Sequence, residues 1–231
     1  MRKRRFFLIL GIVILAGVLV AVFSREREPE YGGKRLSDWV EGLASYAVDS
    51  ADAHLEEEAI RQIGTNALPY LVKWLSYEIP AWKTALYKIV DKTVKKQPDA
   101  WFLRWDKATS RAIGAELALK TLGPQAEAAI GELTKLLNDP KASQSAMRAA
   151  FNLHQMRNAG LPSLLTAFTN QQTTGGLKRF LTFTMGTFGT NARAAVPVLM
   201  QLLNDSDQAL RADATNALRK IDPEALERGT R

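Results

Sequence analysis

The stretch Phe188–Asp222, FGTNARAAVPVLMQLLNDSDQALRADATNALRKID, shows the pattern that organises most of this 231-residue chain. Apolar residues recur in it at helical spacing, first at Ala194, Ala195, Val198, Leu199, Leu202 and Leu203, then at Leu210, Ala214, Ala217, Leu218 and Ile221. This spacing predicts two amphipathic helices joined by a short polar turn. Neither helix has an apolar face wide enough to make a core alone, so the pair needs a copy of itself to stack on.

Related copies of this pair occur through the chain. The same order of residues recurs near 55–75, 117–139 and 149–170, and markers early in the first helix of each pair are Pro69, Gly131, Pro162 and Pro197. These markers are 62, 31 and 35 residues apart, so the first gap spans two periods and contains one divergent unit, 77–110. A period of this length with two helices per unit is typical of a stacked helical array. We therefore expect about five helix pairs within residues 36–231.

The last copy resembles a HEAT repeat. The order Pro…Asp…Arg-Ala-x-Ala-x-x-Ala-Leu is carried by Pro197, Asp205, Arg211, Ala212, Ala214, Ala217 and Leu218. The resemblance covers roughly 55–222 and is closest to short bacterial HEAT-like repeats, which also occur in phycobilisome-lyase-type proteins. The opening 31–39, YGGKRLSDW, is similar to the lead-in of membrane-anchored bacterial HEAT proteins. The resemblance implies an all-α fold, an α-solenoid (α–α superhelix) of HEAT-like helix pairs.

Polar residues near the turns have expected structural roles. Asp139 and Asp205 follow the first helix of a pair, where a carboxylate can accept the free N–H groups at the start of the second helix. The resemblance further implies a hydrogen-bonded ladder between adjacent repeats. We assign to this ladder the pairs Asp139/Arg148, Asn170/Arg179 and Asp205/Arg211.

The N-terminus predicts a membrane anchor. A basic segment, 1–5, precedes an uncharged apolar run of 18 residues, 6–23, which is long enough for a transmembrane helix. The alternatives are a cleaved signal peptide and a buried apolar helix, but the run exceeds a usual signal core and lacks an A-x-A-like site. We expect a juxtamembrane linker at 24–35. The dense basic cluster favours a cytoplasmic N-terminus with residues 24–231 extracytoplasmic.

The net charge of +7 lies mostly near the anchor. Residues 1–35 hold eight basic and three acidic side chains, which leaves +2 for the rest of the chain. The one local concentration of positive charge is in and after the divergent unit, where the candidate partner- or anion-contacting residues are Lys88, Lys92, Lys95, Lys96, Trp101, Arg104, Trp105, Lys107 and Arg111. Such a surface could meet an acidic protein, lipid headgroups or a nucleic-acid backbone. The competing interpretation is a solvated helix face with tryptophans filling a gap in the array.

Catalytic and metal-binding patterns are missing from the sequence. There is no cysteine, and His54 and His154 are a hundred residues apart with no metal-ligand spacing around them. We expect no catalytic residue, metal or cofactor, and a protein partner rather than nucleic acid. The sequence therefore predicts a membrane-anchored scaffold for protein–protein interaction. Two alternatives remain, which are nucleic-acid or anionic-surface binding through 88–111 and a phycobilisome-lyase-like enzyme or accessory.

Overall fold

The computed structural model describes residues 27–45, 53–86, 107–141, 143–170, 173 and 175–229. These residues are mostly helical, so the expectation of an all-α fold is confirmed at that level. None of the helices in these ranges is long and apolar enough to cross a membrane. The predicted span, 6–23, lies outside the described residues.

The described chain begins with a hairpin that packs on the first helices. Strands β1 (Glu30–Tyr31) and β2 (Lys34–Arg35) pair antiparallel through a turn in which Gly32 and Gly33 both have positive φ. Two glycines in the left-handed region suit a tight two-residue turn. The Trp39 indole N–H donates to the Tyr31 carbonyl at 3.2 Å, and the Tyr70 hydroxyl donates to the Arg27 carbonyl at 3.0 Å. Residues 27–35, expected to be a linker, are therefore fixed to the helical domain.

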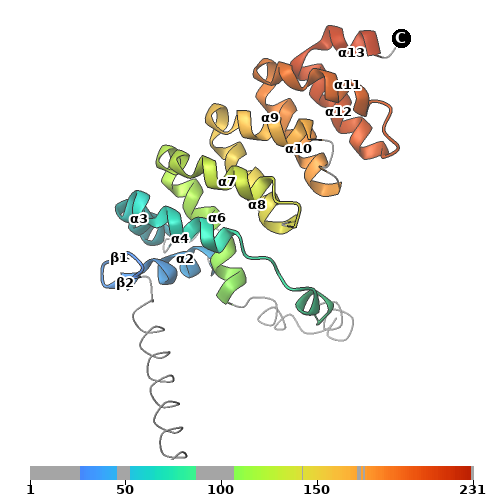
Figure 1. Ribbon diagram of the computed structural model, residues 1–231. Coiled ribbons are helices and arrows are strands. Elements are labelled where there is room, and N and C mark those ends of the chain that lie inside the picture. The colour runs from blue at the N-terminus through green and yellow to red at the C-terminus, as the bar shows by residue number, and fades with distance from the viewer. Residues whose placement is uncertain are drawn as a thin grey trace, which may run out of the picture.

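The helices follow one another in a row (Figure 1). The α-helices are α2 (Leu36–Ser45), α3 (Ala53–Ile63), α4 (Leu68–Leu75), α6 (Lys107–Leu122), α7 (Ile130–Leu137), α8 (Ser143–Gln155), α9 (Leu161–Thr169), α10 (Gly175–Phe188), α11 (Val196–Leu202), α12 (Gln208–Ile221) and α13 (Pro223–Gly229). Short 3-10 turns connect them, namely η1 (Gly64–Ala67), η3 (Gly123–Ala129), η4 (Arg157–Ala159) and η5 (Gly189–Ala195). The predicted pair in Phe188–Asp222 corresponds to η5–α11 and α12.

The helices pack on helices that are close in the row, and many of these are not the next helix in the chain. The strongest contacts join α2 to α6, α4 to α6, α7 to α8 and α10 to α12. Small residues allow the closest approaches, as where Gly186 of α10 faces Ala217 of α12. The buried side chains form a single hydrophobic cluster that runs from Leu36 to Ile221, with no break between successive pairs. The core is therefore long and narrow, which suits a chain that stacks similar units.

A glycine with positive φ follows the end of several of the longer helices. Gly64, Gly123 and Gly189 each begin the 3-10 turn after such a helix, with φ of 62°, 56° and 55°. Glycine is favoured there because it lacks the Cβ that makes positive φ costly. A proline lies in the first turn of α4, α9 and α11, where a missing N–H costs nothing. Pro69, Pro162 and Pro197 are thus each the second residue of their helix. The repeat register predicted from them stays a prediction.

Candidate functional site

The predicted basic surface is only partly within the described residues. Lys88, Lys92, Lys95, Lys96, Trp101, Arg104 and Trp105 lie outside them. Lys107 is exposed at the start of α6, whereas the Arg111 Nε donates to Glu41 of α2 at 2.7 Å. The Arg111 guanidinium also lies over the ring of Trp74 in α4, 5.6 Å from its centroid. Arg111 of α6 therefore contacts both α2 and α4, and these contacts give it a structural role.

A short segment, 77–80, ties the divergent unit to the row. It runs from the end of α4 to the helical residues 81–86, which stand away from the other helices (Figure 1). The Glu78 carboxylate accepts the backbone N–H groups of Gln144 and Ser145 at 3.1 and 2.7 Å, together with the Ser145 hydroxyl at 2.7 Å. These N–H groups are at the start of α8 and have no partner within the helix. Glu78 thus caps α8 from 66 residues away in sequence.

Arg148 holds the same segment from the next turn of α8. Its guanidinium donates to the Tyr77 carbonyl at 3.1 Å. Burial lowers the pKa of Arg148, and the negative charges of Glu78 and Glu116 oppose that shift. Burial likewise raises the pKa of Glu116, with Arg148 opposing. Desolvation accounts for both directions, since removing water disfavours whichever form is charged.

The turn residues predicted as helix caps do not cap. Asp139 accepts from the Lys141 N–H at 2.9 Å and Asp205 from the Asp207 N–H at 3.0 Å, so both stabilise their own turns. Asp207 is the residue that caps α12, and Glu78 takes that place at α8. The prediction was wrong because each turn extends two or more residues past the aspartate before the helix begins, which moves the free N–H groups out of its reach.

The arginines assigned to the ladder bond elsewhere than expected. Arg148 reaches Tyr77 rather than Asp139, and Arg179 pairs with Asp213 of α12 at 3.2 Å. Arg211 does meet its expected residue, although through the Asp205 backbone carbonyl at 2.6 Å. Asn170 is exposed at the end of α9.

Other side chains do join one unit to the next at nearly the repeat spacing. Three such bonds link Thr134 with Ser163, Asn158 with Asn191 and His154 with Thr187, at separations of 29, 33 and 33 residues.

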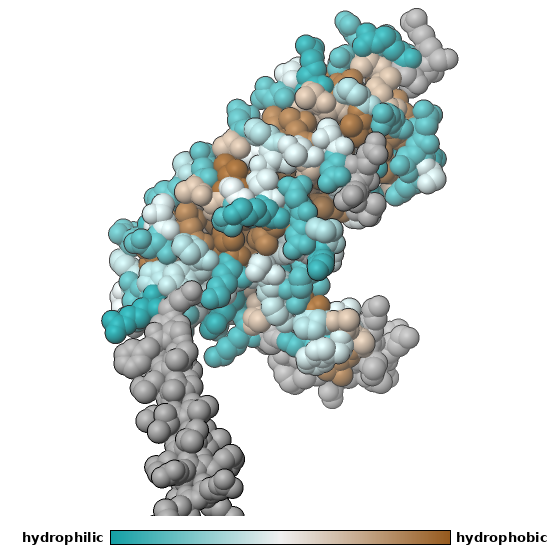
Figure 2. Space-filling view, viewed as in Figure 1, coloured by the Kyte–Doolittle hydropathy of each residue, from teal (hydrophilic) through white to brown (hydrophobic). Residues whose placement is uncertain are grey.

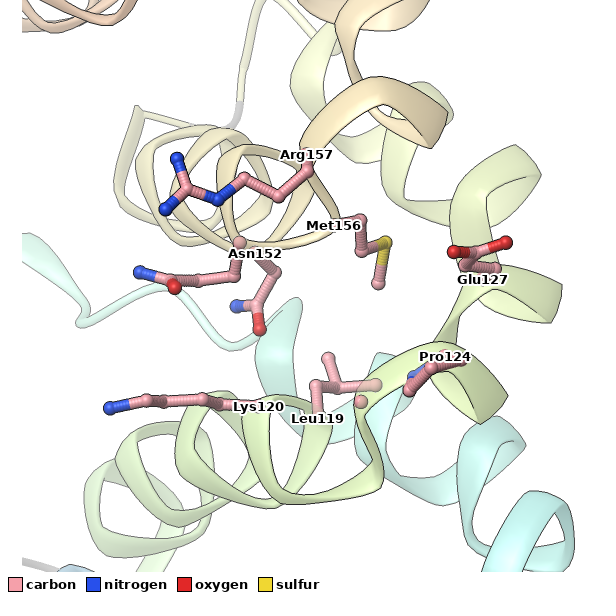
Figure 3. Close-up of a pocket in the computed structure, with 9 residues that line it drawn as sticks. Leu119, Lys120, Pro124, Glu127, Asn152, Met156 and Arg157 are labelled. Atoms are coloured by element: carbon pink, nitrogen blue, oxygen red, sulfur yellow. The ribbon is translucent and has the colours of Figure 1, made fainter. Parts of the chain in front are cut away.

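A pocket opens between α6 and α8 (Figure 3). It has a volume of about 320 Å³ and is open to solvent, with a lining made by Leu119, Lys120, Gly123, Pro124, Glu127, Asn152, Gln155, Met156 and Arg157. Leu119, Pro124 and Met156 supply its apolar part, and Lys120 and Arg157 extend along one side of it (Figure 3). Glu127 lies at the opposite side (Figure 3). The pocket is therefore apolar in the middle and positive at one end.

Two residues of this pocket depart from the repeat. Arg157 begins η4 with φ of 53°, in the place that glycine takes in η1, η3 and η5. Asn152 is 1% exposed and stands five residues before Arg157. The residues five before Gly64, Gly123 and Gly189 are Ala59, Ala118 and Thr184. The Asn152 Nδ2 donates to the Arg148 carbonyl at 2.9 Å. A buried amide, at a place that holds alanine twice and threonine once, and an arginine at a place that otherwise holds glycine both line this pocket.

His154 is on α8, and its ring contacts α10. Its Nε2 is 3.0 Å from the Thr187 hydroxyl, and its ring meets those of Phe180 and Phe188 edge to face at 6.3 and 5.6 Å. Burial lowers the pKa of His154, and the positive charge of Arg157 lowers it further. The neutral imidazole is therefore favoured in the folded chain, and its contacts serve packing.

The sequence patterns did not single out Glu78, Lys120, Asn152 and Arg157. Glu78 gives no local signal, because its partners are distant in sequence. Arg157 did give one, because it stands five residues before Pro162, as Gly64 stands five before Pro69. Among the described residues, no group of acidic and histidine side chains could hold a metal ion. A comparison with protein-family models finds no match, and a comparison with curated proteins finds no relative.

Proposed function

We propose that this chain is a membrane-anchored α-solenoid of HEAT-like helix pairs that binds a protein partner and performs no catalysis itself. The observation that supports the proposal is a set of local features that recur along the row. Positive-φ residues begin equivalent turns, prolines open equivalent helices, and side-chain bonds join neighbouring units at separations near the period. Stacked units of this kind present long, open surfaces that suit a protein ligand.

The surface of the row supports the same proposal. Figure 2 shows hydrophilic residues over most of the visible face, with hydrophobic residues reaching the surface in short patches between the helices. Among the exposed large apolar side chains are Phe183 at 57% and Trp82 at 65%. Aromatic side chains set among polar ones are typical of the anchoring positions in protein interfaces.

The hairpin fixes the distance between the row and the proposed anchor. The Arg27 carbonyl is bonded to Tyr70 of α4, and the predicted span ends at Phe23, four residues earlier. Four extended residues reach about 14 Å at most. If 6–23 spans the bilayer, the β1–β2 end of the row is held close to the membrane surface. A partner would then be met on the membrane or just outside it.

The test is partner capture with the full-length protein. Chemical cross-linking in cells, followed by detergent extraction and affinity purification, should recover a defined protein in constant ratio to the bait. A C-terminal topology reporter should give an extracytoplasmic signal, which determines the compartment in which the partner is sought. Recovery of no specific protein from cells in which the bait is folded would contradict the proposal.

A further inference from the structure

We propose that the pocket between α6 and α8 binds an acidic side chain from an extended segment of the partner, together with a neighbouring apolar side chain of that segment. The inference rests on the proposed function, because the occupant is a part of the partner protein. It adds the place of binding and the chemistry of the segment that binds.

The positive end of the pocket supplies hydrogen-bond donors for a carboxylate. Lys120 and Arg157 point to the same side of the pocket (Figure 3), and neither forms an ion pair with any residue in the described ranges. Asn152, at 1% exposure, lines the pocket between them and uses one N–H of its amide on the Arg148 carbonyl. A carboxylate can accept several hydrogen bonds, and those from charged donors are the strongest.

The rest of the pocket lining would determine the orientation of the bound segment. Leu119, Pro124 and Met156 offer an apolar surface beside the cations, where an aliphatic side chain would lose its contact with water. Glu127 lies at the far side (Figure 3), where it repels a second acidic group and can accept a backbone N–H. A volume of about 320 Å³ is at the lower end of the range for ligand sites, which suits a few side chains.

The backbone of Arg157 is strained by the presence of a side chain at this position. The position has φ of 53°, and glycine occupies it in η1, η3 and η5. A side chain there is strained, and strained residues are concentrated at functional sites. Arginine at this corner places a charge next to Asn152 and Lys120, which a glycine could not do.

The experiment measures peptide binding to the full-length protein in detergent. The probe is a fluorescein-labelled peptide of alternating leucine and glutamate with an amidated C-terminus, followed by fluorescence anisotropy. We expect it to bind, with an affinity that falls as salt is raised. Lys120→Gln and Arg157→Gly should each weaken binding about fivefold or more, as expected for the loss of a charge-assisted hydrogen bond. Lys135→Gln is the matched control, because Lys135 is exposed on α7 outside this pocket and paired with Glu132.

Companion peptides identify the group that is bound. Replacing each glutamate by glutamine should abolish binding, and equal binding of that peptide would overturn the proposal. Binding of the glutamine peptide only when its C-terminus is free would show that the site takes a terminal carboxylate, which also contradicts an acidic side chain. Equal affinity in the wild type, Lys120→Gln and Arg157→Gly would place the peptide elsewhere. Arg157→Gly relieves backbone strain, so circular dichroism should show an intact fold in that variant.

Failure of this inference can be told apart from failure of the proposed function. If the partner is captured equally by wild type, Lys120→Gln and Arg157→Gly, the scaffold function stands and the pocket assignment is wrong. If no partner is captured by any of them, the scaffold function is wrong.

Discussion

Arg157 is the residue at which stability and the proposed binding oppose each other. Its φ of 53° puts a Cβ where η1, η3 and η5 have glycine. A left-handed conformation costs an L-residue about 1 kcal/mol, part of which glycine returns through the greater freedom of the unfolded chain. We expect Arg157→Gly to raise the free energy of unfolding by about 0.5 kcal/mol, measured by urea denaturation.

Gly123 is the reciprocal control. It has φ of 56°, and an added Cβ would meet nothing within 4 Å. Gly123→Ala therefore changes backbone preference without a clash, and it should lower the free energy of unfolding by about 1 kcal/mol. A destabilising Arg157→Gly together with a neutral Gly123→Ala would show that these turns are not conformationally equivalent.

His154 reports the charge on Arg157. Burial lowers the pKa of His154, and Arg157 adds to the shift. Because the folded chain favours neutral imidazole, this contribution to stability is fully present above the usual pKa of 6.5 and is lost as pH falls through the lowered value. In Arg157→Gly the pKa should rise toward 6.5, so the loss of stability at low pH should be smaller and should be complete at a higher pH. An NMR titration of the imidazole measures the first effect, and an unchanged pKa would contradict the assigned cause.

At the scale of elements, the segment 77–80 lies across the N-terminus of α8 and caps it through Glu78. Glu78→Ala removes the acceptor for the Gln144 and Ser145 N–H groups, and loss of a cap costs about 1–2 kcal/mol. We expect faster hydrogen exchange at Gln144, Ser145 and the next turn of α8, with lower stability. Glu132→Ala on α7, whose side chain pairs with Lys135, is the control. Unchanged protection of α8 would show that Glu78 is dispensable.

The α2–α6 contact depends on one glycine. A Cβ at Gly114 would lie 2.0 Å from the Val40 carbonyl oxygen, so Gly114→Ala must move one helix. Overpacking of this kind costs about 3 kcal/mol. Gly131 in α7 has nothing within 4 Å, and Gly131→Ala should instead raise stability by about 0.5–1 kcal/mol. Thermal unfolding should show a lower melting temperature for Gly114→Ala and a higher one for Gly131→Ala. Similar melting temperatures for the two variants would contradict the close contact between α2 and α6.

The sequence predicts the elements of this fold better than their connections. Helical apolar spacing and the prolines placed α4, α7, α9, α11 and α12, because these signals are local. The cap on α8 could not be found this way, since Glu78 is 66 residues from Gln144 and resembles any surface carboxylate. Asp205 and Asp139 were misassigned because a cap depends on where the turn ends, which spacing alone does not fix.

At the scale of the whole molecule, the elongated shape follows from the way the helices pack on one another. Each unit buries its apolar face on its neighbours, so the hydrophobic cluster extends along the row from Leu36 to Ile221. Glu78 joins the segment 77–80 to the start of α8, and Asn152 and Arg157 line the α6–α8 pocket beside that helix. In the proposed function, this pocket is the preferred place to bind on the row.

The most direct test of this account is site-specific photo-cross-linking of the full-length protein in cells. A benzophenone amino acid replaces Gln155, which lines the α6–α8 pocket, and in a separate variant it replaces Gln201, which is exposed on α11. The account predicts one discrete protein adduct from position 155, weakened by Arg157→Gly, and none of the same mass from position 201. The absence of an adduct at 155, or the same adduct at both positions, would contradict it.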